Sequence, residues 1–414
     1  MREMKDSGVA WVGAMPEDWT VKRGKFTLKL LNRPVKDTDD VITCFRNGEV
    51  TLRTNRRTDG FTFSVKEIGY QGIETGDLVI HGMDGFAGSI GISDSRGKSS
   101  PVLVVCDTDE NKRYIMYYLR SMAYNDVFTA LSTGIRVRSC DLRWNKLAEL
   151  PYILPSFIEQ DKIVSAIESS TSKVDVLIAN VQAQIEKLKT YKQSLITEVV
   201  TKGLDPNAPM KDSGVDWIGT IPENWNVVKT GRLFKENNRC PIGNDVPLSL
   251  SQADGLVATD DMKESSLKTS SYDNWKRVEI GDLVLNRFKA HLGVLFAAKL
   301  TGIVSFHYGV YEARCRLVPK FYEYLYHSNQ YKAILGNASN GMVVGLQNLS
   351  NLSFYTTYSL YPPYAEQEKI ADYLDTKCSQ IDQLISLKES KIEKLQQYKR
   401  SLIYEYVTGK KEVV

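Results

Sequence analysis

Arginine and lysine side chains gather with amide side chains at several places in this sequence. Four arginines lie within twelve residues, together with Asn47 and Asn55, and two further groups follow: Arg46, Arg53, Arg56 and Arg57; Arg136, Arg138, Arg143 and Lys146; Lys276, Arg277, Asn286, Arg287, Lys289 and His291. Arginine and lysine hold phosphates, and Arg, Asn and Gln read base edges in the major groove. These groups favour contact with nucleic acid. For each single residue, a solvated surface charge is the alternative.

Other chemistry is not indicated. The six cysteines are scattered without a Cys-x-x-Cys pair, and the four histidines do not cluster with them at metal-ligand spacing. No Gly-x-x-x-x-Gly-Lys-Ser/Thr loop for a nucleotide occurs, and no glycine-rich strand-to-helix loop for a cofactor is evident. We therefore predict no catalytic, cofactor-binding or metal-binding residues in this chain.

Composition sets wide bounds. The chain has 414 residues, 42% hydrophobic and 25% charged, which is typical of a globular protein with two or three domains. Its net charge of +3 argues neither for nor against nucleic acid, because binding depends on where the basic residues sit. The first residues lack the apolar region of a secretory signal, and no run approaches the length of a membrane helix. We expect a cytoplasmic protein.

The sequence repeats itself once. Residues 5–21 and 211–227 are identical at eleven of seventeen positions, at an offset of 206. Residues 159–201 and 366–408 are identical at twenty of forty-three positions, at an offset of 207. Two long matches at nearly one offset indicate a duplicated unit.

Each copy has the same internal order. A segment with two tryptophans and Gly-x-x-Pro comes first, a stretch in which the copies share little follows, and a proline-marked turn precedes a long helical pattern. Since the tryptophans recur in both copies (Trp11, Trp19, Trp217 and Trp225), we interpret them as scaffold or partner-facing residues rather than as residues that read sequence. Residues 203–210 form the Gly/Pro-rich break between the copies.

Each copy ends in a predicted helix of roughly 40 residues, which would span about 60 Å. Apolar residues recur at helical spacing, and we expect them to pair the helices: Ile167, Val174, Leu177, Val181, Leu188 and Leu195 in the first copy, and Ile381, Leu384, Ile385, Ile392, Leu395 and Leu402 in the second. A stripe this long predicts a helical partner, of which the obvious one is the duplicate. The alternative is two helices that each lie on their own domain.

The stretches between look mixed and β-rich. Gly76-Asp77 and Gly281-Asp282, at an offset of 205, each precede an apolar run typical of a buried strand, Leu78–Ile80 and Leu283–Leu285. Residues 112–128 and 320–336 have apolar residues at helical spacing and predict short helices.

These motifs resemble one family. The signature Lys-Asp-Ser-Gly-x-x-Trp-x-Gly-x-x-Pro-x-x-Trp, followed by Glu-Gln-x-Lys-Ile at the start of a long helix, occurs twice and is similar to the specificity subunits of Type I restriction-modification systems. The first copy departs from the usual proline pair, with Leu154-Pro155-Ser156 before its helix.

The resemblance implies an α+β fold with pseudo-twofold duplication: two globular, β-rich target-recognition domains joined by two long antiparallel helices that form a coiled coil. The corresponding segments are recognition domains at 1–154 and 211–361, long helices at 155–202 and 362–410, and a linker at 203–210. Each recognition domain would read one half of a split DNA site, while the helices set the spacing and dock modification subunits.

The resemblance also implies partners: double-stranded DNA, two methyltransferase subunits that use S-adenosylmethionine, and motor-nuclease subunits that use ATP and Mg²⁺. In related proteins the loop after the Gly-Asp-Leu strand often lies near DNA. The resemblance therefore favours two segments as DNA-contacting: Asn286–His291 and His81–Phe86, the latter including Met83 and Asp84. Two other classes remain as alternatives: the recognition portion of a fused restriction enzyme, and a coiled-coil scaffold.

One motif could suggest catalysis. Tyr361-Pro362-Pro363-Tyr364 resembles the Asn/Asp-Pro-Pro-Tyr motif of amino-methyltransferases. The first residue of that motif must accept hydrogen bonds from the target amine, for which tyrosine is a poor substitute. We therefore expect no methyltransferase activity from this segment.

Overall fold

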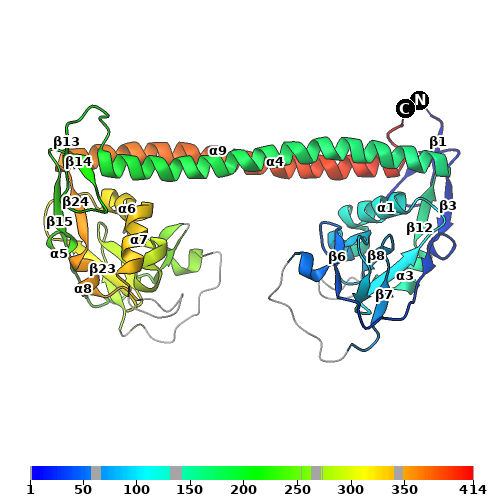
Figure 1. The fold of residues 1–414 in the computed structure, drawn as a ribbon, viewed down its shortest axis with the longest axis horizontal. Coiled ribbons are helices and arrows are strands. Elements are labelled where there is room, and N and C mark those ends of the chain that lie inside the picture. Colours follow the sequence, from blue (N-terminus) through cyan, green and yellow to red (C-terminus); the bar gives the residue numbers. More distant parts are fainter. Residues whose placement is uncertain are drawn as a thin grey trace. The chain divides into compact units, whose positions relative to one another are not determined.

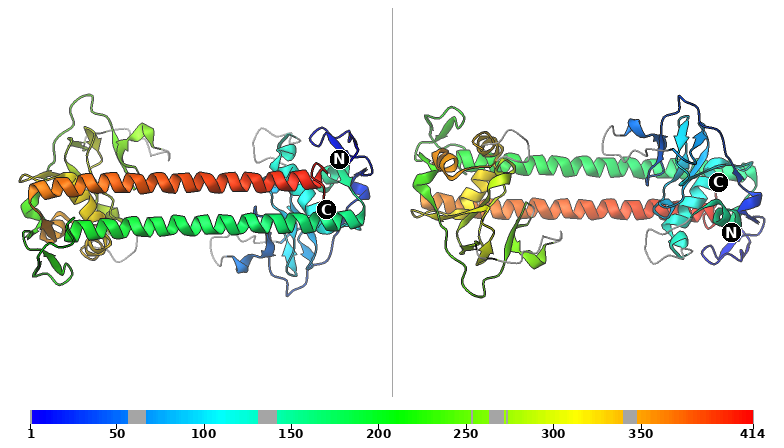
Figure 2. Two further views of the ribbon diagram at one scale, coloured as in Figure 1. Left: turned by 90° about the horizontal axis from the view of Figure 1, so that it is seen from above. Right: turned by 90° about the horizontal axis from the view of Figure 1, so that it is seen from below.

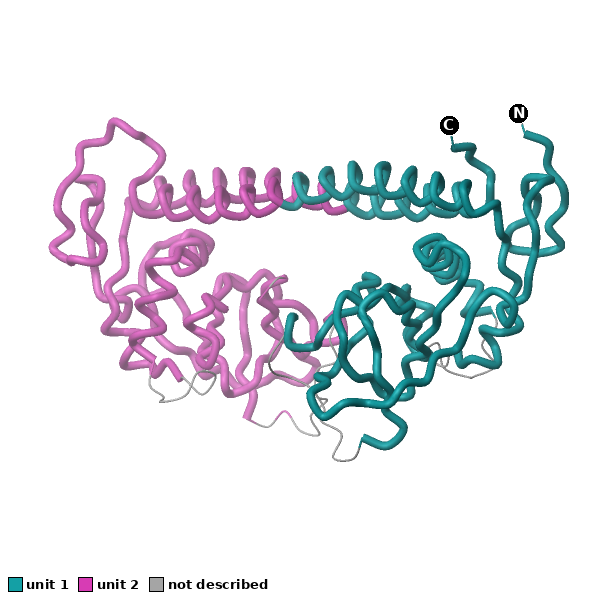
Figure 3. Tube along the Cα trace, turned by 45° about the vertical axis from the view of Figure 1, so that its right-hand side comes forward, with its two compact units in different colours: residues 1–182, 390–414 teal, residues 183–389 magenta. Residues whose placement is uncertain are grey.

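The computed structural model describes residues 2–56, 67–130, 142–252, 254–262, 272, 274–339 and 348–413. The chain divides into two compact units, with unit 1 formed by residues 1–182 and 390–414 and unit 2 by residues 183–389 (Figure 3). Two long helices contribute to both units (Figure 1): α4 (Phe157–Lys202) and α9 (Tyr364–Val407). The candidate residues Arg57, Arg136 and Arg138 lie outside the described residues.

Unit 1 contains short antiparallel strands. Their bounds are β1 (Met4–Asp6), β2 (Ala14–Pro16), β3 (Thr20–Arg23), β4 (Lys29–Leu30), β5 (Ile42–Cys44), β6 (Val50–Leu52), β7 (Gln71–Ile73), β8 (Leu78–His81), β9 (Ile90–Ile92), β10 (Gly97–Ser99), β11 (Leu103–Asp107) and β12 (Pro151–Leu154). The largest sheet has the order β4-β11-β8-β9, and the pairs β1-β2, β3-β12, β5-β6 and β7-β10 surround it. The helices here are α1 (Lys112–Tyr124), α2 (Val127–Ala130), α3 (Trp144–Glu149) and the 3-10 turns η1 (Gly24–Phe26), η2 (Arg53–Asn55) and η3 (Gly85–Ala87).

Unit 2 repeats this order of pairings. Its strands are β13 (Met210–Asp212), β14 (Thr220–Pro222), β15 (Asn226–Lys229), β16 (Phe234–Glu236), β17 (Leu248–Ser251), β18 (Gly255–Ala258), β19 (Lys276–Val278), β20 (Leu283–Asn286), β21 (Leu295–Ala297), β22 (Gly302–Val304), β23 (Tyr308–Ala313) and β24 (Tyr358–Tyr361). The sheet β16-β23-β20-β21 corresponds to the one in unit 1, beside the pairs β13-β14, β15-β24, β17-β18 and β19-β22. The helices are α5 (Thr230–Leu233), α6 (Pro319–His327), α7 (Asn329–Asn337), α8 (Asn351–Thr356) and the turns η4 (Thr259–Asp261) and η5 (Arg287–Leu292).

These elements confirm the mixed, β-rich class and the long helices predicted from the sequence. The predicted strands are β8 and β20, and the predicted short helices are α1-α2 and α6-α7. Within the described part of the chain, no helix is both long and apolar enough to cross a membrane.

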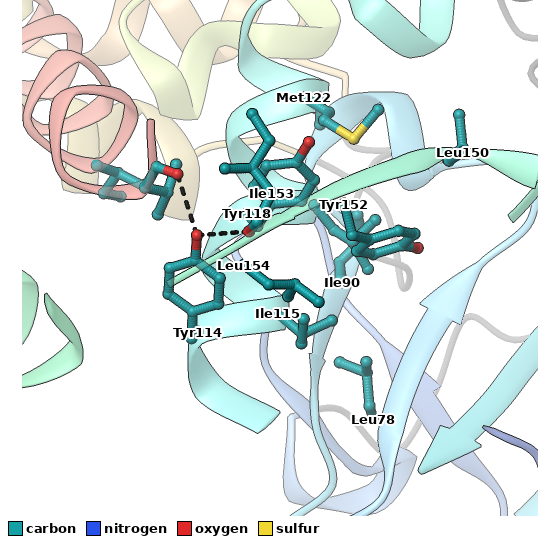
Figure 4. Packing of buried hydrophobic residues seen from close by; sticks show 14 of the residues in the cluster. Leu78, Ile90, Tyr114, Ile115, Tyr118, Met122, Leu150, Tyr152, Ile153 and Leu154 are labelled. Carbon is teal, nitrogen blue, oxygen red and sulfur yellow. Dashed lines mark hydrogen bonds between the residues drawn. The ribbon is translucent and has the colours of Figure 1, made fainter. Parts of the chain in front are cut away.

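The core of unit 1 joins the sheet to α1 and to the long helices. Figure 4 shows Tyr114, Tyr118 and Tyr152 packed with Ile115, while Leu78 and Ile90 come from the sheet. The Tyr114 hydroxyl lies 2.8 Å from the carbonyl oxygen of Ile153 and 3.2 Å from that of Val407. Because a buried hydroxyl must find an acceptor, these carbonyls hold α1 beside the end of α9.

In both units, residues of α4 and α9 pack against each other. Figure 2 shows the two helices side by side. In unit 1, Val174 and Leu402 belong to one buried cluster, and Lys399 Nζ binds Asp175 at 2.6 Å. In unit 2, Lys192 Nζ binds Asp382, also at 2.6 Å. Asp175 and Asp382 are equivalent at the 207-residue offset, and so are Lys192 and Lys399, so the same ion pair forms twice.

The direction of pairing is visible within unit 2. Gln184, which precedes Lys192 on α4, accepts a hydrogen bond from Lys388, which follows Asp382 on α9. The segments therefore run antiparallel there.

The predicted apolar stripe needs a correction at two positions. Ile167, Val174, Val181, Ile381 and Leu402 are buried, and Leu188, Leu195, Ile385, Ile392 and Leu395 are half-buried. In contrast, Leu177 and Leu384 have exposed fractions of 50% and 48%. Successive helical residues are about 100° apart around the helix axis. Because the neighbouring Ile178 and Ile385 face the partner helix, Leu177 and Leu384 face outward.

The Glu-Gln motif explains how each long helix is fixed to its unit. The Gln160 side chain is fully buried; its Oε1 accepts from the Asn111 backbone N–H at 2.8 Å, and its Nε2 donates to the Pro155 carbonyl. Gln367 does the same with the Val318 N–H at 2.9 Å and the Pro362 carbonyl. Asn111 and Val318 are the N-cap residues of α1 and α6. Each glutamine thus joins the start of a long helix to the start of a short one.

We expect Gln160→Ala to lower the free energy of unfolding by about 1–3 kcal/mol, because it removes the side-chain partner of the part-buried Asn111 N–H and of the buried Pro155 carbonyl. Urea denaturation of the purified chain measures this loss. Gln184→Ala, an exposed position on the same helix, is the control and should change stability by less than about 0.5 kcal/mol. Equal effects of the two substitutions would contradict the anchoring role of Gln160.

Candidate DNA-recognition interface

The Gly-Asp-Leu motifs prove to be strand anchors. Gly76 and Gly281 have φ of 90° and 93°, a left-handed conformation that favours glycine. The Asp77 carboxylate then accepts from the Glu74 backbone N–H at 2.8 Å and pairs with Arg33. Asp282 accepts from the Glu279 N–H, also at 2.8 Å, and pairs with Arg239. Both carboxylates are almost completely buried.

This burial has an electrostatic consequence. It raises the pKa of Asp282, and the Arg239 guanidinium counteracts the rise. Arg33 and Arg239 are equivalent at an offset of 206, in stretches that otherwise share little. Sequence reasoning missed both arginines, although that shared offset was the available signal.

The residue that ends each anchored strand makes the same turn in both units. The His81 Nδ1 accepts from the backbone N–H groups of Met83 and Asp84, at 3.2 and 3.0 Å. The Asn286 Oδ1 accepts from those of Phe288 and Lys289, at 3.1 and 3.2 Å. Strand β8 and strand β20 therefore pass into their following turns through a side chain that satisfies two backbone donors.

In unit 1 the turn borders an open cleft of about 810 Å³. The cleft brings together candidates that are distant in the sequence, and it is lined by Thr43, Cys44, Phe45, Arg46, Asn47, Arg56, His81, Asp84 and Ser89. Arg46 pairs with Asp84 at 3.0 Å, and Arg56 lies 4.4 Å from the centre of the Phe45 ring. Burial raises the pKa of the Cys44 thiol to about 12, so this side chain lines the cleft as an uncharged thiol.

Two further candidates of unit 1 lie nearby. The Met83 side chain is 54% exposed at the tip of the turn. Arg53 is half-buried and donates from Nε to the Thr43 hydroxyl at 3.4 Å. The cleft thus combines cations, a carboxylate and an imidazole, which are groups that recognise phosphates and base edges, and the exposed Met83 lies on the turn beside it.

Unit 2 places its candidates differently. Lys276 and Arg287 both bind one carboxylate oxygen of Glu236, at 2.7 and 2.5 Å, and Arg287 also donates to Asn351. Arg277 pairs with Asp245 at 3.4 Å and with Glu279 at 3.1 Å. Lys276, Arg287 and Glu236 are all mostly buried, and the two cations compensate the charge of the carboxylate. These cations are therefore engaged within the unit rather than presented on its surface.

Lys289 and His291 complete the set in unit 2. Lys289 is exposed, and no carboxylate within the described ranges pairs with it. His291 is half-buried, and its Nδ1 has no hydrogen-bond partner among the residues that the structure describes. The exposed Phe288 lies beside them, with its ring centre 5.5 Å from that of His307.

Known proteins match almost the whole chain, although no protein family model matches it. It is 23% identical over 451 residues to the proposed specificity subunit of the type I restriction enzyme MjaX from Methanocaldococcus jannaschii, covering 96% of this chain and 95% of that protein. It is 24% identical over 419 residues to the MjaVIII specificity subunit of the same organism, covering 96% and 93%. The curated relatives that this chain resembles over almost its full length are therefore specificity subunits of Type I restriction enzymes.

Solved structures share the fold of this chain. A chain from a structure concerned with complex assembly and conformational transition of the type I R-M system matches with a TM-score of 0.68 at 15% identity, covering 95% of this chain and 98% of that one. The HsdS subunit from Thermoanaerobacter tengcongensis matches with a TM-score of 0.51 at the same identity and coverage.

In this chain, residues shared by the two copies are mainly structural. Trp19 and Trp225 are buried, and the indole N–H of Trp19 donates to Glu159 at 3.1 Å. Residues around the strand-end turns differ between the copies: His81 corresponds to Asn286, Met83 to Phe288 and Asp84 to Lys289, all at an offset of 205. No group of three or more His, Cys, Asp or Glu side chains arranged to hold a metal occurs among the residues that the structure describes.

Proposed function

We propose that this chain is a specificity subunit that recognises a bipartite, asymmetric DNA site, with each recognition domain reading one half-site. The proposal rests on one observation: residues shared by the two copies fix the strand, and residues that differ between the copies follow it. Asp77 and Asp282 anchor the same strand in the two units, whereas the side chains presented after that strand differ. A common frame with different presented groups suits two half-sites of different sequence.

The long helices connect the two recognition domains. They form an antiparallel coiled coil, set the separation of the half-sites and dock two modification subunits. The recurring ion pair between α4 and α9 supports this, because it gives the helix pair the approximate symmetry that two equivalent docking partners require. The recognition domains correspond to residues 1–154 and 211–361, the helices to 155–202 and 362–410, and the linker to 203–210.

Within this proposal the chain itself catalyses nothing. Methylation is carried out by the modification subunits with S-adenosylmethionine, and cleavage by restriction subunits with ATP and Mg²⁺. The relatives are named specificity subunits, which supports a recognition role without its own reaction.

The test is selection from a random DNA library by the full chain assembled with its modification subunits. We expect two short sequence blocks separated by a spacer of fixed length and unrestricted sequence. Repeating the selection at increasing salt separates phosphate contacts, which weaken all sequences alike, from base contacts. A single uninterrupted block, or no enrichment, would contradict the proposed function.

A further inference from the structure

The strand-end residues His81 and Asn286 each use one side-chain atom, Nδ1 or Oδ1, to accept hydrogen bonds from the backbone. Each accepts two N–H groups from the turn that follows it. Because these donors occupy the acceptor atom, they determine which atoms remain for a ligand.

For His81 this determines the tautomer. A proton on Nδ1 would face two backbone N–H groups, so Nδ1 stays unprotonated and Nε2 carries the hydrogen. Burial also lowers the pKa of His81, which keeps the ring neutral. Nε2 has no hydrogen-bond partner in the described part of the chain and is not among its buried unpaired atoms. His81 lines the unit 1 cleft and therefore offers that cleft a single N–H donor.

For Asn286 the same bonds determine the orientation of the amide. Oδ1 accepts from Phe288 and Lys289, so Nδ2 with its two hydrogens is the group left over. Nδ2, too, is without a hydrogen-bond partner among the described residues and is not a buried unpaired atom. Asparagine ordinarily reads adenine by using both its oxygen and its nitrogen. Because Oδ1 already accepts two backbone hydrogen bonds, Asn286 cannot contact adenine through both its oxygen and its nitrogen.

We infer that His81 and Asn286 are equivalent base-reading donors, one in each recognition domain, and that each selects a keto base, guanine or thymine, through its acceptor atoms in the major groove. Guanine offers N7 and O6, and thymine offers O4, whereas cytosine offers only an N–H donor there. Adenine places its N6 donor beside its only acceptor, N7, and so opposes a side chain that can only donate. The inference rests on the proposed function and adds the class of base that one position in each half-site contains.

The variant Asn286→Asp tests this with little change in shape. The carboxylate keeps an oxygen for the two backbone N–H groups but replaces the outward donor by an acceptor. Selection by the assembled complex should then change at one position of one half-site, from a keto base to cytosine or adenine, by on the order of 10-fold in relative enrichment. His81→Asp should do the same in the other half-site only, so each variant is the control for the other.

The exchanges His81→Asn and Asn286→His keep both the backbone contact and the outward donor. We expect them to keep the keto base, and thermal unfolding of every variant reports whether it folds. Loss of the keto preference in a folded exchange variant would overturn the inference, even if an aspartate variant did not fold. Unchanged sequence preference in the aspartate variants, or an equal loss for all sequences, would also overturn it. Failure of the unaltered chain to select two blocks would instead contradict the proposed function itself.

Discussion

A variant of this chain with seven residues inserted at equivalent points of both long helices is expected to prefer a DNA spacer about three base pairs longer. The points follow Gln182 in α4 and Glu389 in α9, which are equivalent at the 207-residue offset. Seven helical residues add about 10 Å, and B-DNA rises about 3.4 Å per base pair. Both sequence blocks should be retained, because neither recognition domain changes.

The length of seven residues matters for the helix pairing. It is close to two turns, so the apolar stripe keeps its face to within about 20°. Three base pairs, however, rotate the second half-site by about 100° around the DNA axis, so we expect weaker binding along with the longer spacer.

Selection of random DNA by the assembled complex measures the spacer. A seven-residue insertion after Asn207, in the linker between α4 and β13, is the control and should leave the spacer unchanged. If a folded double-helix insertion also kept the original spacer, the helices would not set the half-site separation.

The second large effect concerns stability at acidic pH. Burial, reinforced by the nearby positive charge of Lys332, lowers the pKa of His327 from 6.5 to about 4. In the unfolded chain the imidazole becomes protonated below about pH 6.5, whereas in the folded unit it stays neutral until about pH 4. The unfolded state therefore binds more protons between these values, and stability falls as the pH falls through this window.

The expected loss from this one group is about 2 kcal/mol between pH 7.5 and pH 5, and about 3 kcal/mol by pH 4. Urea denaturation at several pH values measures it. The His327→Gln variant removes the titrating group and should lose correspondingly less stability between pH 7.5 and pH 5 than the unaltered chain. Identical pH dependence of the two proteins would show that His327 does not stay neutral in the folded unit. Carboxylates such as Glu312, whose pKa is lowered mainly by a hydrogen bond with Lys235, affect both proteins alike and at lower pH.

Much of this protein is determined by patterns that are local in the sequence. The repeat at an offset of about 206 residues predicts two copies of one unit, and the spacing of apolar residues predicts α4 and α9 to within a few residues. The glycine before Asp77 and the glycine before Asp282 predict the turn into β8 and β20, because that turn needs a positive φ. Helical periodicity and turn chemistry depend on neighbouring residues, so they can be read without the tertiary structure.

Only the tertiary structure decided which side chains meet. Lys276 and Arg287 are basic residues in a candidate segment, yet both turn to Glu236, which lies 40 and 51 residues away in the sequence. The unit 1 cleft joins Arg46 to His81, and the buried Gln160 reaches Asn111, again across long separations. A basic side chain can pair with an internal carboxylate or remain available to a ligand. Which of these occurs depends on burial and on the path of the chain, and neither can be read from residue type or spacing.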